Sequence, residues 1–278
     1  MESKNKVAIV MTIHNRIEAT LRCLKSLGDY VNSLDIYITD DGSTDNSADV
    51  VKAYYPNIYI LQGEGNLFWN RGMYVAFGEA MKQRYDYYLW LNNDTYVIDG
   101  FLDNLITVAK TYNDKAIICG ATISEETGDV TYGGYTASSQ MIGLAKEDQE
   151  CAFASGNILL IPYEVAMAVG NLDYYYKHAL GDFDYEAQAR KKGFKIVQAR
   201  ENYGYCERHP TIPVWRDASI PFKKRWENLY SPLGRPPFDF FYYHKKNTNY
   251  FTAIAIFIIL NIRCIFPRLW KKSYDLVE

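Results

Sequence analysis

Residues 87–94 read YYLWLNND, an apolar run that ends abruptly in Asn92, Asn93 and Asp94. A short continuous apolar run of this composition predicts a buried strand. In an open α/β sheet, ligands bind beyond the carboxyl ends of the strands. We therefore expect these three polar side chains at a binding site, where they can contact a metal ion or a sugar.

Two further strands are predicted to end in the same way. Residues 34–39 run directly into Asp40 and Asp41, and the apolar, β-branched residues 7–11 run into a polar segment. Since parallel strands end at one edge of a sheet, polar residues from three strands are expected there. The candidates from the polar segment are Thr12, Asn15 and Arg16.

Segments 7–16, 40–45 and 92–94, in this order and spacing, resemble family 2 glycosyltransferases of the GT-A fold. The resemblance covers roughly the first four fifths of the chain. It implies an α/β fold, in which helices cover a Rossmann-like, mostly parallel sheet.

The predicted organisation is one GT-A domain and an extension. The domain covers residues 1–210, with a nucleotide-binding half at about 1–115 and an acceptor-binding half at about 116–210. Residues 211–278 are rich in Pro, Trp, Arg and Tyr and form a C-terminal basic and apolar extension, expected to be helical and to associate with membrane. Locally, we expect a hairpin at 129–137 and a helix at 44–54, with Ser43 or Thr44 as its N-cap.

In the family, an Asp-x-Asp motif after the fourth strand holds the divalent cation that neutralises the departing phosphates. Here that motif reads Asn92-Asn93-Asp94, so Asp94 inherits the ligand role and Asn92 supplies no charge. The alternative is that the three residues only turn the chain. The cation is expected to be Mn²⁺ or Mg²⁺. His209 is a second candidate ligand, or else an exposed histidine beside Pro210.

The resemblance also implies a nucleotide pocket. Thr12, Asn15 and Arg16 are expected to line it, and either Asp40 or Asp41 accepts a hydrogen bond from the pyrimidine or ribose; we favour Asp41. The remaining nucleotide-binding candidates are Asn70, Gly72, Asn92 and Asn93. Trp69 is expected against a sugar, or as an apolar plug beneath its loop.

The acceptor side is predicted from residues 181–196. In the family, an acid at the start of the corresponding helix is the general base that takes the proton of the acceptor hydroxyl. Alignment on Gly193 gives this role to Asp182, with Asp184 as the second candidate and Gly181 where the family often has Glu. The alternative is that these acids only stabilise the helix N-terminus. Gly156 and Asn157 resemble the acceptor-side loop.

Charge and cysteine content limit the possible partners and the compartment. The net charge is −3, but residues 218–278 hold ten Lys or Arg and four Asp or Glu, a local charge of +6. This distribution disfavours nucleic-acid binding and suits an anionic membrane surface. The apolar residues 250–262 are too few to cross a bilayer, which needs about 20. Five cysteines without a C-x-x-C pair favour reduced cytosol. We expect a cytoplasmic protein, peripheral on the inner face of the cell membrane.

Together these observations predict a metal-dependent, inverting glycosyltransferase. The donor is expected to be a UDP- or dTDP-sugar and the acceptor a saccharide or lipid-linked saccharide in bacterial cell-surface polysaccharide synthesis, with rhamnosyl transfer as one subtype that the resemblance suggests. A sugar-nucleotide pyrophosphorylase is disfavoured, because residues 12–16 lack the glycines of its activation loop. A noncatalytic nucleotide- or saccharide-binding membrane protein is the alternative, and a homodimer is left open.

Overall fold

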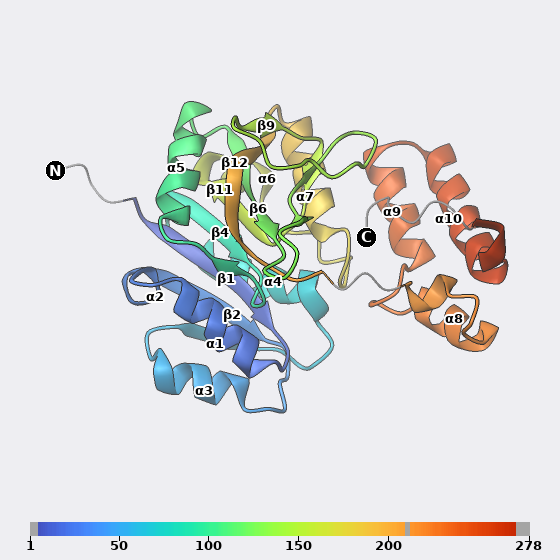
Figure 1. The fold of residues 1–278 in the computed structure, drawn as a ribbon, viewed down its shortest axis with the longest axis horizontal. Coiled ribbons are helices and arrows are strands. Elements are labelled where there is room, and N and C mark those ends of the chain that lie inside the picture. The colour runs from blue at the N-terminus through green and yellow to red at the C-terminus, as the bar shows by residue number, and fades with distance from the viewer. Residues whose placement is uncertain (1–4, 209–211, 271–278) are drawn as a thin grey trace.

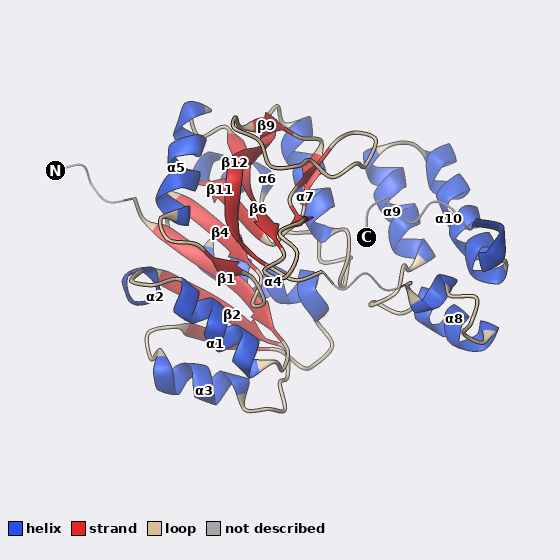
Figure 2. Cartoon of the chain, in the orientation of Figure 1, coloured by secondary structure: helices blue, strands red, loops and turns tan. Residues whose placement is uncertain are grey.

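The structure, a computed structural model, describes residues 5–208 and 212–270, and its centre is one twisted sheet (Figures 1 and 2). The strand order is β3-β2-β1-β4-β11-β6-β12-β5. β11 and β5 run antiparallel to their neighbours, and the other pairs along this order are parallel. In that order the strands are Tyr59–Gln62, Asp35–Asp40, Val7–Ile13, Tyr87–Leu91, Ile158–Pro162, Ala116–Ile123, Lys195–Tyr205 and Tyr96–Val97.

Helices cover both faces of the sheet because buried strand residues alternate in direction. Ile9 and Met11 of β1 join the core beneath α1, α2, α3 and α5, whereas Ala8 and Val10 join the core beneath α4, α6 and α7. This confirms the predicted α/β fold. The seven helices are Ile17–Ser26, Tyr30–Ser33, Ser47–Tyr54, Phe101–Thr111, Phe68–Ala80, Tyr163–Val169 and Gly181–Lys191, in the order just used.

The C-terminal extension is helical and lies at one end of the molecule, beside α7 (Figure 1). Its own core of Trp215, Leu229, Phe240 and Leu260 also includes Tyr176 from the α/β domain. Its elements are η1 (Val214–Arg216), α8 (Phe222–Leu229), α9 (Pro237–Asn247), α10 (Tyr250–Ile265) and η2 (Pro267–Trp270). None of the helices within the described ranges has both the length and the apolar composition that crossing a bilayer requires.

Two local predictions are wrong. Instead of one hairpin at 129–137, β7 (Val130–Tyr132) pairs with β6, and β8 (Gly134–Tyr135) pairs with β10 (Phe153–Ala154). A short strand β9 (Gln149–Glu150) pairs with β12. The helix predicted from Thr44 begins at Ser47, after Asn46 in a left-handed conformation. The hairpin prediction fails because distant strands decide the pairing, which local turn residues do not reveal. The helix starts later because Asn46 is left-handed and Ser47 N donates to Asp45 Oδ1 at 3.1 Å.

Candidate active site

The carboxyl ends of β1, β2 and β4 meet at one edge of the sheet. β1 is parallel to both neighbours and pairs Ile13 with Asp40, the last residue of β2. The loops after these strands therefore leave the sheet together, as predicted. At this edge Arg16 Nη1 lies 3.1 Å from Asp94 Oδ2, which joins the loops after β1 and β4.

The loop after β1 is held in a costly backbone conformation. Asn15 and Arg16 have φ of 57° and 62°, a region that non-glycine residues enter at a cost of roughly 1–2 kcal/mol each. Hydrogen bonds to the next loop hold it: Asn15 N donates to Ser43 Oγ at 2.7 Å, and Asn15 Oδ1 accepts from Thr44 N at 2.8 Å. Asn15 thus fixes the loop that presents Arg16 to Asp94.

Asp40 and Asp41 are buried at 3% and 4% exposure, and both accept hydrogen bonds from backbone N–H groups of loops at this edge. Asp41 Oδ1 accepts from Gly65 N at 2.8 Å and Oδ2 from Phe68 N at 2.9 Å, while Asp40 Oδ1 accepts from Ser43 N at 3.0 Å. Asp41 therefore fixes the segment that leads into α4. Its predicted contact with the nucleotide stays a prediction.

Gly72 allows α4 to approach β1 closely. A Cβ there would lie 2.1 Å from Thr12 Oγ1, and Thr39 Oγ1 donates to the Gly72 carbonyl at 2.8 Å. Thr12 Oγ1 in turn donates to the Thr39 carbonyl at 3.3 Å. Gly72 therefore has a packing role that the sequence analysis did not predict. Its predicted contact with the nucleotide stays a prediction.

Asn70 holds a neighbouring loop, and its predicted contact with the nucleotide stays a prediction. Its side chain is fully buried, and Nδ2 donates to the carbonyls of Asp173 at 2.9 Å and Tyr176 at 2.8 Å. A Cβ on Gly181 would lie 1.6 Å from Asn70 Oδ1. Asn70 thus holds the loop before α7, and its position explains why Gly181 cannot be the glutamate often found in the family.

Four residues connect the end of β4 to the start of α7. Trp69 Nε1 donates to Asn92 Oδ1 at 2.7 Å, and a Cβ on Gly156 would lie 2.8 Å from the Trp69 ring and 3.3 Å from Asp182 Oδ2. Gly156 N donates to that same oxygen at 3.0 Å. The indole therefore lies between Asn92 and the Gly156–Asp182 pair. The structure brings these predicted site residues together although they lie far apart in the sequence.

Asn93 and Asn157 make internal contacts. Asn93 Nδ2 donates to Thr20 Oγ1 at 2.9 Å, and the buried Asn157 Nδ2 reaches Thr95 Oγ1 at 3.4 Å. The Asn157 carbonyl also accepts from Asn92 N at 3.1 Å. Both residues brace the loop that carries Asp94. Their predicted contacts with ligands stay predictions.

Asp182 has the chemistry of a proton acceptor near neutral pH. Burial raises the pKa of its carboxyl group to about 6, although hydrogen bonds from Phe183 N and Gly156 N partly oppose the shift. As a residue it is half-buried and so reaches the surface. A carboxylate with a pKa close to the working pH is well matched to general-base catalysis.

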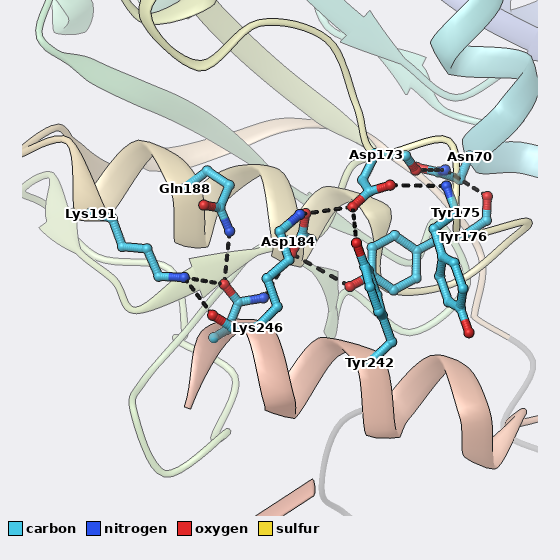
Figure 3. A network of polar contacts seen from close by, with 10 residues as sticks. Asn70, Asp173, Tyr175, Tyr176, Asp184, Gln188, Lys191, Tyr242 and Lys246 are labelled. Carbon is cyan, nitrogen blue, oxygen red and sulfur yellow. Dashed lines mark hydrogen bonds and ion pairs between the residues drawn. The ribbon is translucent and has the colours of Figure 1, made fainter. Parts of the chain in front are cut away.

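Asp184 faces the C-terminal extension (Figure 3), and its predicted catalytic role stays a prediction. Its side chain is 2% exposed and accepts from Lys246 Nζ at 2.7 Å and Asn247 Nδ2 at 2.7 Å, both on α9. Lys246 Nζ also lies 2.8 Å from Asp173 Oδ2. Asp184 therefore attaches α7 to the extension.

A comparison with models of protein families shows the family of this chain. The model described as Glycosyl transferase family 2 matches residues 8–170, more than half of the chain. The chain belongs to glycosyl transferase family 2. The matched segment contains the ends of β1, β2 and β4, and it stops before α7.

Individual relatives agree with this family. The chain is 29% identical over 137 residues to a protein described as uncharacterized glycosyltransferase YibD of Escherichia coli (strain K12), and the match spans 46% of this chain and 38% of that protein. The fold is similar to a crystal structure of GalNAc-T7 with UDP, GalNAc and Mn²⁺, with a TM-score of 0.56 and 13% identity over 85% of this chain and 51% of that one.

Asp94 is suited to a divalent cation of the kind that family 2 enzymes use. Its side chain is 31% exposed, and Mg²⁺ is commonly held by one or two carboxylates together with substrate phosphates. Cys206 Sγ lies 4.0 Å from Asp94 Oδ1, but burial raises the pKa of that thiol to about 12, so it stays protonated. The described residues include no cluster of three potential metal ligands, and His209 lies outside the described residues.

Glu186 is a site feature for which the sequence analysis predicted no role. It is fully buried, Oε2 accepts from Ala154 N at 2.8 Å, and Oε1 has no hydrogen-bond partner. Burial raises the pKa of Glu186 well above its usual value. Its spacing offered a signal, because Glu186 lies four residues after Asp182 and so on the same helix face. Its raised pKa distinguishes Glu186 from Asp182, which hydrogen bonds from two backbone N–H groups stabilise as a carboxylate.

Proposed function

We propose that this chain is a metal-dependent, inverting glycosyltransferase that moves a sugar from a UDP- or dTDP-sugar to a saccharide or lipid-linked saccharide. We place it in bacterial cell-surface polysaccharide synthesis, at the cytoplasmic face of the membrane. The observation that carries the proposal is the connection through Trp69 and Gly156, which sets Asp182 beside the loop that ends in Asp94.

In the proposed reaction, this chain takes part in one proton transfer. Asp182 accepts the proton of the acceptor hydroxyl, and the hydroxyl oxygen forms a bond to the anomeric carbon on the face opposite the nucleotide. The bond from that carbon to the diphosphate oxygen breaks, and the nucleoside diphosphate leaves with its electron pair. The raised pKa of Asp182 favours uptake of the proton near neutral pH.

Asp94 would hold the cation, which neutralises negative charge on the departing diphosphate when bound. Arg16 Nη1 lies 3.1 Å from Asp94 and supplies a second positive charge at the same edge. The GalNAc-T7 structure is described with UDP and Mn²⁺, which supports a nucleotide and a cation on this fold. Asp94 belongs to the nucleotide side of the site and Asp182 to the acceptor side.

The test is release of nucleoside diphosphate from a panel of UDP- and dTDP-sugars with Mn²⁺. We expect slow donor hydrolysis without acceptor and faster release with one. Asp94→Ala should lose both, whereas Asp182→Asn should retain nucleotide binding. A wild-type protein that binds nucleotide but never releases it from any donor would instead support the noncatalytic alternative.

Membrane association is proposed from the surface of α10. Phe251 is 84% exposed and Ile258 49% exposed. They belong to a row of exposed apolar side chains at helical spacing, which consists of Phe251, Ile254, Ile258, Ile262 and Ile265. The exposed Lys223 and Lys224 of α8 belong to the same basic extension. A short apolar helix near basic side chains is typical of a monotopic anchor on anionic lipid.

Point substitutions test this anchor better than removal of α10, because Arg225 Nε donates to the Cys264 carbonyl at 3.1 Å and removal would expose the core of the extension. Phe251→Ser with Ile258→Ser should reduce sedimentation with phosphatidylglycerol vesicles about tenfold or more, given about 1.5–3 kcal/mol for each buried side chain. Tyr54→Ser, an exposed aromatic residue on α3, is the control. Equal sedimentation of all variants would reject the anchor.

A further inference from the structure

A cavity of about 740 Å³ lies between the catalytic body and the C-terminal extension. The body contributes α7 and residues 178–180, and the extension contributes η1, α9 and the loop between α8 and α9. Figure 1 shows α9 beside α7, and the salt bridges of Asp184 and Asp173 with Lys246 fix this arrangement. The cavity therefore exists only when the extension is docked.

The lining of the cavity combines apolar side chains with basic ones. Leu180, Phe183, Trp215 and Phe240 are among its apolar residues. Its ionisable side chains include two arginines and two histidines, but no aspartate or glutamate among the lining residues. The basic residues are Arg190, Arg235, His178 and His244. Such a lining suits a ligand that has both an anionic group and an apolar part.

Arg235 brings positive charge to the lining of the cavity, next to two histidines. The Arg235 guanidinium lies 4.5 Å from the centre of the Phe240 ring. Burial of His244 lowers the pKa of that histidine, and the positive charge of Arg235 lowers it further. His178 also lines the cavity, and burial lowers the pKa of its imidazole.

The cavity lies next to the candidate base. Phe183 lines it, and Phe183 N donates to Asp182 Oδ1 at 2.9 Å. Tyr243, another lining residue, has a pKa raised chiefly by burial, with smaller contributions from the charges of Glu186, Asp184 and Asp182. A ligand in the cavity would therefore lie close to the carboxylate that is proposed to activate the acceptor.

We propose that this cavity binds a phosphate-bearing amphiphile, which is the anchoring part of the acceptor. Arg190 and Arg235 contact the phosphate, and the aromatic and leucine side chains contact the apolar part. The assignment rests on the proposed function, because it identifies the acceptor of the same reaction. The apolar row on α10 belongs to the same extension, consistent with an acceptor supplied from a membrane.

The test measures binding of decyl phosphate to the full chain by calorimetry, below the micelle concentration. Decyl glucoside is the uncharged comparison and inorganic phosphate the comparison without a chain. We expect decyl phosphate to bind at least about tenfold more tightly than either, and Arg235→Gln and Arg190→Gln each to weaken it about tenfold, as expected for loss of a charge-assisted contact. Lys25→Gln, an exposed residue of α1 outside the cavity lining, should bind like wild type.

Equal binding of the charged and uncharged amphiphiles, or wild-type affinity in both arginine variants, would overturn the proposal. So would a loss of phosphatidylglycerol vesicle binding in Arg235→Gln that equals its loss of decyl phosphate binding, because the cavity would then bind membrane head groups. Donor hydrolysis without acceptor distinguishes failure of the cavity assignment from failure of the proposed function. If it persists while the amphiphile fails to bind, only the cavity assignment fails, whereas its absence in wild type counts against the proposed function.

Discussion

Two acids on α7, two residues apart, show how differently the site and the interface with the extension use a carboxylate. Asp182 accepts hydrogen bonds from Phe183 N and Gly156 N, forms no salt bridge with another residue of the described ranges, and has a pKa raised to about 6. Asp184 is buried against Lys246 and Asn247. A carboxylate paired with lysine stays charged and fixes structure, whereas a desolvated carboxylate without such a cation can exchange a proton.

The largest expected effect comes from Asp182→Asn. Turnover should fall roughly a hundredfold or more, because the amide cannot accept the proton. The variant should fold, because the raised pKa of Asp182 means that its charge costs the native state free energy at neutral pH, and the neutral amide does not carry this cost. The measurement is turnover alongside calorimetric UDP binding. Unchanged turnover would reject Asp182 as the base.

Asp184→Ala should give the opposite result. It leaves Lys246 and Asn247 without a buried acceptor, so we expect about 3 kcal/mol lower free energy of unfolding, the low end for a broken buried pair because Lys246 keeps Asp173. Urea unfolding measures the change, and Asp182→Asn is the matched control. A catalytic defect at unchanged stability would return Asp184 to the active site.

Gly156→Ala should have a smaller effect on the site. The added Cβ would lie 2.8 Å from the Trp69 ring and 3.3 Å from Asp182 Oδ2, so the indole must move. We expect turnover to fall about tenfold through misplacement of the base. Gly143→Ala, whose Cβ would enter open space, should behave like wild type. Full activity of Gly156→Ala would show that this contact does not position Asp182.

The smallest expected effect is on the pH profile. Because the base must be ionised, kcat/KM should fall as pH decreases, to about half its plateau at pH 6 and not at pH 4. The neighbouring Glu186 is fully buried, and burial raises its pKa well above the usual value. Steady-state kinetics from pH 5 to pH 8 with a fixed buffer salt would measure this. An acidic limb near pH 4 would show that Asp182 is not desolvated.

The sheet edge was predictable from the sequence, but the contacts behind it were not. The strands that end at Asp40 and Asp94 stand out because apolar runs stop abruptly at polar residues. By contrast, Asn70 binds carbonyls of residues 173 and 176, and Asp184 binds Lys246. A motif indicates which residue types are present, whereas partners 60 or more residues away decide which of them face the ligand.

The central claim is that one cleft, with Asp94 on its nucleotide side and Asp182 on its acceptor side, binds an activated sugar through its diphosphate. Calorimetric titration of UDP and dTDP into wild type and Asp94→Asn, with and without Mn²⁺, tests it most directly. We predict Mn²⁺-dependent binding of at least one nucleotide by wild type, weakened tenfold or more in Asp94→Asn. Binding that is equally tight without Mn²⁺ and in Asp94→Asn would contradict the account.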